Sequence, residues 1–125
     1  IRSLAKGIFE AIKDLGRNTV IIASSDLNHM GRFYGVYAKG LSAKEYGERL
    51  DKMAIEAILS LDTQRFLKIV EENQMSVCGV GAIGTLMEYS KIANAKEVKL
   101  LKYANSAQIS GEEDISVGYA SIIVL

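Results

Sequence analysis

A short apolar run that ends in a polar tip constrains the fold of this chain more than any other feature. Residues 19–23 are β-branched or small and apolar, and Ser24, Ser25 and Asp26 follow at once. This composition predicts a short buried strand. Open α/β folds keep their ligands and their chemistry at the ends of strands. We therefore expect reactive side chains at the Asp26 end of this run.

Helical periodicity surrounds the run. Apolar spacings of three and four predict helices over residues 2–15, 43–61, 62–72 and 80–93. Gly16 fits a left-handed cap that ends the first helix, and Asp62 fits an N-cap. Ser42 with Glu45 forms a capping-box pattern, which makes the second helix the most strongly signalled.

Two strands are expected near the end of the chain, over residues 97–104 and 115–125. The second is almost continuously apolar, which is typical of a central strand covered on both faces. The order of helices, loops and strands predicts an α/β fold with a layered arrangement. A length of 125 residues fits one domain over residues 1–125.

The balance of charge argues against a polyanionic partner. Fifteen Lys and Arg residues match fifteen Asp and Glu residues, so no net field favours nucleic acid or an anionic membrane. No apolar run approaches the roughly 20 residues of a membrane helix. A single cysteine cannot form an internal disulfide, which fits a cytoplasmic location. The chain enters a helix almost at once, and we expect it to be a piece of a longer protein.

Three side chains are the candidates for chemistry: Asp26, the lone histidine His29 and the lone cysteine Cys78. An imidazole acts as acid or base near neutral pH, and a nearby carboxylate can orient it. Cys78 precedes a helix N-terminus, where the dipole favours the thiolate that binds metals or attacks electrophiles. The spacing leaves open whether His29 and Cys78 form a nucleophilic pair, as in a cysteine hydrolase, or ligate one metal.

Glycines and aromatic residues raise two further alternatives. Residues 28–41 predict an irregular loop whose rings either wall a pocket or pack onto the core, and these rings are Phe33, Tyr34 and Tyr37. Gly79, Gly81 and Gly84 match the dinucleotide pattern Gly-x-Gly-x-x-Gly. The strand that follows ends without the expected ribose-binding carboxylate. We therefore interpret these glycines as allowing a tight turn and close packing.

Several motifs together resemble the C-terminal half of the Memo family, also called AmmeMemoRadiSam system protein B. In chain order they are Ser24, Ser25, Asp26, His29 and Gly31; residues 50–53; Cys78, Gly79, Ile83 and Gly84; Tyr103, Ala104, Ser106 and Gln108; and Ser116, Val117, Tyr119 and Ala120. The resemblance covers essentially the whole chain. It implies that residues 1–125 are the C-terminal portion of a single Memo-like domain.

The resemblance implies a fold similar to the class III extradiol ring-cleaving dioxygenases. That fold has a mostly parallel sheet with helices on both faces and a metal in a cleft at the strand ends. The resemblance also implies that Cys78 ligates the metal, that His29 acts as acid or base over it, and that Asp26 lies beside His29. A thiolate ligand in place of the dioxygenase carboxylate favours iron(II) or copper.

Two histidines that complete the metal site in the family belong to its N-terminal half and are absent here. We therefore expect weak or no metal binding unless that half is present as a partner. Ser24, Ser25 and Gln108 are expected to add hydrogen bonds around the site. The leading hypothesis is a metal-dependent oxidoreductase acting on a small molecule. The alternative is a non-catalytic module that binds a peptide or a protein in the same cleft.

Overall fold

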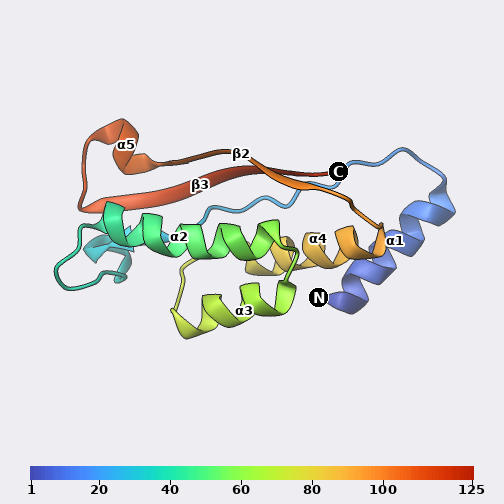
Figure 1. Cartoon of the computed structure of the whole chain (residues 1–125), viewed down its shortest axis with the longest axis horizontal. Helices are drawn as coiled ribbons and strands as arrows, with labels where there is room; N and C mark the ends of the chain where they lie inside the picture. The colour runs from blue at the N-terminus through green and yellow to red at the C-terminus, as the bar shows by residue number, and fades with distance from the viewer.

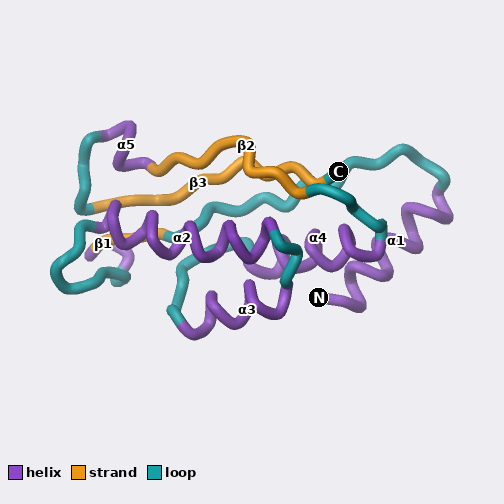
Figure 2. Tube along the Cα trace, in the orientation of Figure 1, coloured by secondary structure: helices purple, strands orange, loops and turns teal.

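The structure is a computed structural model that describes all 125 residues, and it is α/β with a three-stranded sheet. Its elements are α1 (Arg2–Leu15), β1 (His29–Gly31), the 3-10 helix η1 (Arg32–Tyr34), α2 (Ala43–Leu59), α3 (Thr63–Glu72), α4 (Val80–Ile92), β2 (Val98–Asn105), α5 (Ser106–Ser110) and β3 (Ile115–Val124). Figures 1 and 2 show β2 and β3 along one side, α2 and α4 beneath them, and α1 at one end. None of the helices is both long and apolar enough to span a bilayer.

The sheet is antiparallel throughout, with the strand order β1-β3-β2. His29 of β1 lies opposite Val117, and Tyr103 of β2 lies opposite Ala120. The mostly parallel sheet with helices on both faces that we expected is therefore not present within this chain. Parallel neighbours need a long crossover connection, whereas β2 and β3 are joined only by α5 and a short loop.

β3 is central in the sheet, as expected, but it is not covered on both faces. Tyr119 is 46% exposed and Ile123 is 38% exposed, whereas Ile122, which points to the opposite face, packs against the core. Alternate side chains of a strand point to opposite faces, and α2 packs against β3. The face of β3 that carries Tyr119 and Ile123 is therefore left uncovered by this chain.

Residues 19–23 were predicted to form a buried strand, and this prediction is wrong for the chain as described. The segment has no strand assignment and no partner strand. Val20 is 86% exposed and Ile22 is 83% exposed. A strand needs a neighbour to satisfy its backbone groups, and this segment lies outside every ladder of the sheet.

The predicted helices are confirmed, with ends within about two residues of those expected. Gly16 ends α1 with a left-handed φ of 61°. Ser42 caps α2 in a full capping box, since its Oγ accepts from the Glu45 amide at 3.2 Å while the Glu45 carboxylate accepts from the Ser42 amide at 3.0 Å. Asp62 caps α3 by accepting from the Arg65 amide at 2.9 Å. Local side-chain chemistry therefore sets these helix starts and stops.

The core lies between the sheet and the helices and is built around α2. Leu50, Ala54 and Ile58 form its buried stripe, and Phe66 of α3 and Met30 of β1 are fully buried against it. This spacing of four residues places the three α2 side chains on one helix face. Burial of Met30 anchors the segment that carries the adjacent His29.

α1 packs on α4 through an aromatic contact and a charged one. The rings of Phe9 and Tyr89 lie 5.9 Å apart, and Arg2 Nε donates to Glu88 Oε2 at 3.1 Å. Lys91 pairs with the other oxygen of Glu88. Burial raises the pKa of the Glu88 carboxyl, but the hydrogen bonds from Lys91 and Arg2 and the charge of Lys91 outweigh it and lower that pKa to about 2.

Candidate functional site

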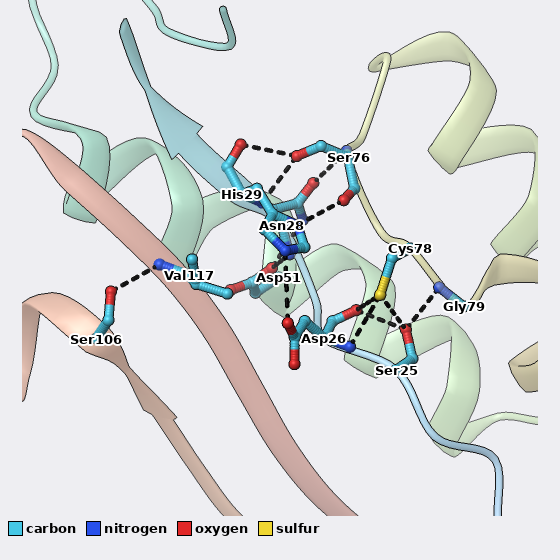
Figure 3. Close-up of polar contacts among 10 residues, drawn as sticks. All are labelled: Ser25, Asp26, Asn28, His29, Asp51, Ser76, Cys78, Gly79, Ser106 and Val117. Carbon is cyan, nitrogen blue, oxygen red and sulfur yellow. Dashed lines mark hydrogen bonds and ion pairs between the residues drawn. The ribbon is translucent and has the colours of Figure 1, made fainter. Parts of the chain in front are cut away.

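Two segments far apart in the sequence run side by side at the candidate site, as Figure 3 shows. Ser76 joins them through four hydrogen bonds, one of which is to the His29 ring. The His29 amide donates to Ser76 Oγ at 2.7 Å, Ser76 Oγ donates to the His29 carbonyl at 2.8 Å, and the Ser76 amide donates to Asn28 Oδ1 at 3.0 Å. These contacts fix residues 76–79 against residues 25–29.

Cys78 is exposed, and its sulfur lies against the backbone of Asp26. The Asp26 amide donates to Cys78 Sγ at 3.3 Å, and Ser25 Oγ lies 3.7 Å from the same sulfur. Ser25 Oγ also accepts from the Gly79 amide at 2.8 Å and donates to the Asp26 carbonyl at 2.6 Å. The sulfur therefore remains accessible to a metal or an electrophile.

The hydrogen bonds of His29 identify its tautomer. Its Nδ1 lies 2.9 Å from the Ser76 carbonyl oxygen, which can only accept, so Nδ1 carries a proton. Its Nε2 lies 3.4 Å from Asp26 Oδ2. The Tyr34 ring packs edge-on against the imidazole with centroids 5.3 Å apart. Nε2 is therefore the nitrogen left to gain or lose a proton, beside a carboxylate.

A buried carboxylate supports this cluster from beneath. Asp51 Oδ1 accepts from the Asn28 amide at 2.9 Å and from Asn28 Nδ2 at 2.7 Å, and Asp51 Oδ2 accepts from the Tyr103 hydroxyl at 2.7 Å. Burial raises the pKa of Asp51, although these three hydrogen bonds oppose the shift. Burial and the Asp51 carboxylate raise the pKa of Tyr103. Asn28 connects this network to Ser76 and so to the cluster above.

The structure brings together the three candidates chosen from the sequence. Asp26 contacts Cys78 through its backbone amide and His29 through its carboxylate. No hydrogen bond joins the sulfur of Cys78 to the imidazole of His29, so the nucleophilic-pair alternative lacks its expected contact. The roles of acid or base for His29 with Asp26, and of metal ligand for Cys78, stay predictions.

Ser24, Ser25 and Gln108 were expected to add hydrogen bonds around the site, and the structure places only one of them there. Ser25 lies at the site through its contacts with Cys78 and Gly79. Ser24 is exposed, and its side chain makes no hydrogen bond. Gln108 accepts from the Asn105 amide at 3.3 Å in the capping box of α5 and contacts none of the candidate residues. Of the three, only Ser25 therefore touches the site.

Sequence reasoning missed the residues that hold the site in place: Asn28, Asp51 and Ser76. Asp51 lies within the family-like motif in α2, but nothing in its spacing marks it as a partner of Asn28. A polar residue on the buried face of an amphipathic helix was the available signal, because buried carboxylates need partners.

The glycine pattern is explained by packing at Gly79. A Cβ at this position would collide with the side chain of Ser25 and lie 2.9 Å from the Ser24 carbonyl oxygen. Gly79 has a φ of −102°, so close approach rather than backbone conformation requires glycine here. This contact brings Cys78 beside Ser25, in agreement with the close-packing interpretation.

The aromatic loop contributes one ring to the site and leaves two exposed. Tyr34 contacts His29, whereas Phe33 is 80% exposed and Tyr37 is 63% exposed. Phe33 and Tyr37 line a hollow together with Arg32 and Lys39. The loop is therefore not packed onto the core as one unit.

Comparison with known proteins identifies one family. Residues 1–123 match the family described as Memo-like protein. A MEMO1 family protein of Desulfurococcus amylolyticus is 42% identical over 121 residues, covering 97% of this chain and 38% of the relative. One of Pyrococcus horikoshii is 40% identical over 126 residues, covering 98% of this chain and 43% of the relative. The chain thus spans about two fifths of the length of these relatives.

Proposed function

This chain belongs to the Memo-like protein family, and we propose that it is the part of a metal-dependent oxidoreductase that supplies one metal ligand and an acid–base pair. The observation that carries the proposal is the meeting of Cys78 and His29 around Asp26. A thiol and an imidazole from distant segments share one neighbour on an accessible surface.

Cys78 fits the role of ligand by its surroundings. Its sulfur is exposed, and the Asp26 amide donates a hydrogen bond to it, so the sulfur is both accessible and held in position. Within this chain no group of three His, Cys, Asp or Glu residues is arranged to hold a metal. We therefore propose that the other ligands are histidines from the part of the protein outside this chain, which also completes the mostly parallel sheet.

Iron(II) or copper is the metal class that suits a thiolate with histidine ligands, and it would supply redox chemistry at this surface. His29 and Asp26 have the geometry of an acid–base unit. The Ser76 carbonyl fixes the imidazole through Nδ1, and Asp26 lies beside Nε2, the nitrogen that exchanges a proton with substrate. An imidazole held on both sides loses little freedom when it acts.

The test compares Cys78→Ser with His29→Ala in the full-length protein. We expect Cys78→Ser to lose bound iron or copper, measured by elemental analysis after gel filtration. We expect His29→Ala to keep the metal and to lose oxygen uptake with catechol-type substrates. Asp14→Asn, in the exposed face of α1, is the surface control and should change neither readout.

Equal metal retention in the two variants would contradict the assigned roles. The isolated 125-residue chain offers a second check, because one ligand cannot hold a metal tightly. We expect no tight stoichiometric site when it is titrated with iron(II) or copper, and a tight site would show that the ligand set has been misassigned.

A binding module is the second candidate, and the exposed aromatic loop favours it. Phe33 and Tyr37 with Arg32 and Lys39 form a hollow that suits a peptide carrying apolar and acidic side chains. If the metal-loaded full-length protein shows no oxygen uptake with any catechol-type substrate, this candidate replaces the first. Phe33→Ala would then be expected to weaken peptide binding.

A cytoplasmic location is part of the proposal. Cys78 is a free and exposed thiol, and such a thiol persists best in a reducing compartment. Localisation of the tagged full-length protein by cell fractionation tests this directly.

A further inference from the structure

The two segments that meet at the candidate site are joined only through side chains (Figure 3). Ser76 bonds to His29 at one end of their contact, and Gly79 bonds to Ser25 at the other. No backbone amide of either segment donates to a backbone carbonyl of the other. Hydroxyl, amide and thiol side chains make the bonds instead. These side chains therefore set the spacing between the two segments.

The hydroxyl of Ser76 takes the place of a strand residue beside His29. Its Oγ accepts from the His29 amide at 2.7 Å and donates to the His29 carbonyl at 2.8 Å. In an antiparallel ladder, a residue of the neighbouring strand satisfies the same two groups with its own carbonyl and amide. One hydroxyl thus pairs both backbone groups of His29 and holds the backbone of Ser76 one side chain away.

The backbone of Ser76 reaches the ring of the same histidine. Its carbonyl oxygen lies 2.9 Å from His29 Nδ1, and its amide donates to Asn28 Oδ1 at 3.0 Å. Asp51 orients the Asn28 amide, because Asp51 Oδ1 accepts from Asn28 Nδ2 at 2.7 Å and leaves Oδ1 of Asn28 to face Ser76. The carbonyl of Ser76 is therefore held in place, and it can pair only with a protonated Nδ1.

The neighbours of Ser76 hold this segment to the core independently of its hydroxyl. Met75 and Val77 are both buried and belong to the core around α2. Loss of the hydroxyl should therefore loosen the contact with His29 without releasing the whole segment. The two backbone groups of His29 would then take water as their partner, and the carbonyl of Ser76 would move away from Nδ1.

We propose that Ser76 is a positioning residue whose hydroxyl sets the tautomer of His29, with the proton on Nδ1 and with Nε2 directed toward Asp26. In a neutral imidazole, the hydrogen bond made by one nitrogen decides which nitrogen carries the proton. Only this tautomer leaves a lone pair on Nε2 to accept a proton there. The tautomer follows from the contacts of Ser76 alone, whereas its use in acid–base chemistry rests on the proposed function.

The test reads the tautomer of His29 by nitrogen-15 NMR, because protonated and unprotonated ring nitrogens differ in chemical shift. Spectra are recorded on the full-length protein with labelled histidine, freed of metal by a chelator, at about pH 9, well above the ordinary imidazole pKa of about 6.5. The signals of His29 are identified by their absence from His29→Gln. We expect the Nδ1–H form to dominate in the natural protein and in Ser76→Thr, which keeps the hydroxyl. In Ser76→Ala the ratio of Nδ1–H to Nε2–H should fall about fivefold, the equivalent of one hydrogen bond.

Ser90→Ala is the matched control, because it removes a buried serine hydroxyl that bonds only to the Leu86 carbonyl within α4. It should lower the urea midpoint and leave the tautomer of His29 unchanged. An unchanged tautomer in Ser76→Ala, an equal change in Ser90→Ala, or an Nε2–H form in the natural protein would overturn the proposal. Should Ser76→Ala not fold, Ser76→Val, which matches threonine in shape but lacks its hydroxyl, is compared with Ser76→Thr by the same criteria. The metal-free spectra do not depend on oxygen uptake, so failure of the proposed function leaves the result unchanged.

Discussion

Replacement of Asp51 is the sharpest perturbation of the network beneath the site. Asp51→Ala removes the acceptor of the Asn28 amide, of Asn28 Nδ2 and of the Tyr103 hydroxyl. Asn28 is fully buried, so water cannot replace the lost bonds there. Each buried donor left unpaired costs about 1–3 kcal/mol. Removing the buried carboxylate also removes the free-energy cost of burying its charge, and this offsets part of the loss. We therefore expect Asp51→Ala to lower the free energy of unfolding by about 3 kcal/mol.

Asp51→Asn is the matched control because it keeps one carbonyl oxygen. Both Asn28 bonds end on Asp51 Oδ1, so an amide can preserve them, and its NH₂ can donate to the Tyr103 hydroxyl. We expect a loss of about 1 kcal/mol or less, since no donor of Asn28 becomes unpaired. The difference between the two variants therefore reports the hydrogen bonds to Asn28 and not the charge of Asp51.

The pH dependence has a definite sign. Burial raises the pKa of Asp51 above its usual value of 3.8, so the folded state holds this proton at a pH where the unfolded state has released it. Stability from this group is thus greatest below pH 3.8 and is lost as pH rises through the folded pKa. The stability of the natural chain relative to Asp51→Asn should fall over that range.

Urea unfolding followed by far-ultraviolet circular dichroism measures these differences, because the chain is rich in helix. The series is recorded for the natural chain and both variants at several pH values. Equal losses for Asp51→Ala and Asp51→Asn would refute the assigned hydrogen bonds. A natural chain that gains stability over Asp51→Asn as pH rises would refute the direction of the pKa shift.

Three further outcomes test the fold around the site. Gly79→Ala should destabilise the chain by about 2 kcal/mol because its Cβ collides with Ser25, whereas Gly81→Ala meets no neighbour and should cost nothing in the same urea assay. Ser42→Ala should cost about 1 kcal/mol through loss of the capping box, seen as a lower urea midpoint. Glu88 has a pKa of about 2, below its usual value of 4.5, so its contribution to the free energy of unfolding is present above pH 4.5 and is lost as pH falls toward 2. We place this loss at about 1 kcal/mol because Arg2 is exposed and its charge is screened by solvent. Glu88→Gln should not show this loss when its stability is measured at decreasing pH.

Helix positions were predictable because their signals are local. Gly16, Ser42 and Asp62 set helix ends through contacts within four residues of themselves, and each was recognised from the sequence. The short elements were not. β1 is only three residues long within a glycine-rich loop, and α5 is a five-residue helix that depends on a capping box between Asn105 and Gln108, which was not recognised in the sequence.

The sheet was harder to predict because strand pairing is not local. Residues 19–23 have the composition of a strand, yet no other segment of this chain lies beside them in register. Composition reports what a segment can bury, whereas a ladder also needs a neighbour with free backbone groups. For the same reason, the apolar composition of β3 predicted a strand covered on both faces, although Ile123 is exposed in the structure.

The reactive residues of the candidate site could be predicted from the sequence, whereas the residues that hold them in place could not. Asp26, His29 and Cys78 could be chosen because their side chains are chemically reactive, and two of them are the only residues of their type. Ser76 and Asp51 could not be chosen, because serine and aspartate are common and their importance lies in the distance to Asn28 that only folding creates. Ser76 holds residues 76–79 against the His29 segment, and Asp51 holds the same segment from α2. The reactive groups therefore meet because buried polar bonds join two segments that apolar packing alone would leave free to slide, and a change in those bonds should move the site before it unfolds the protein.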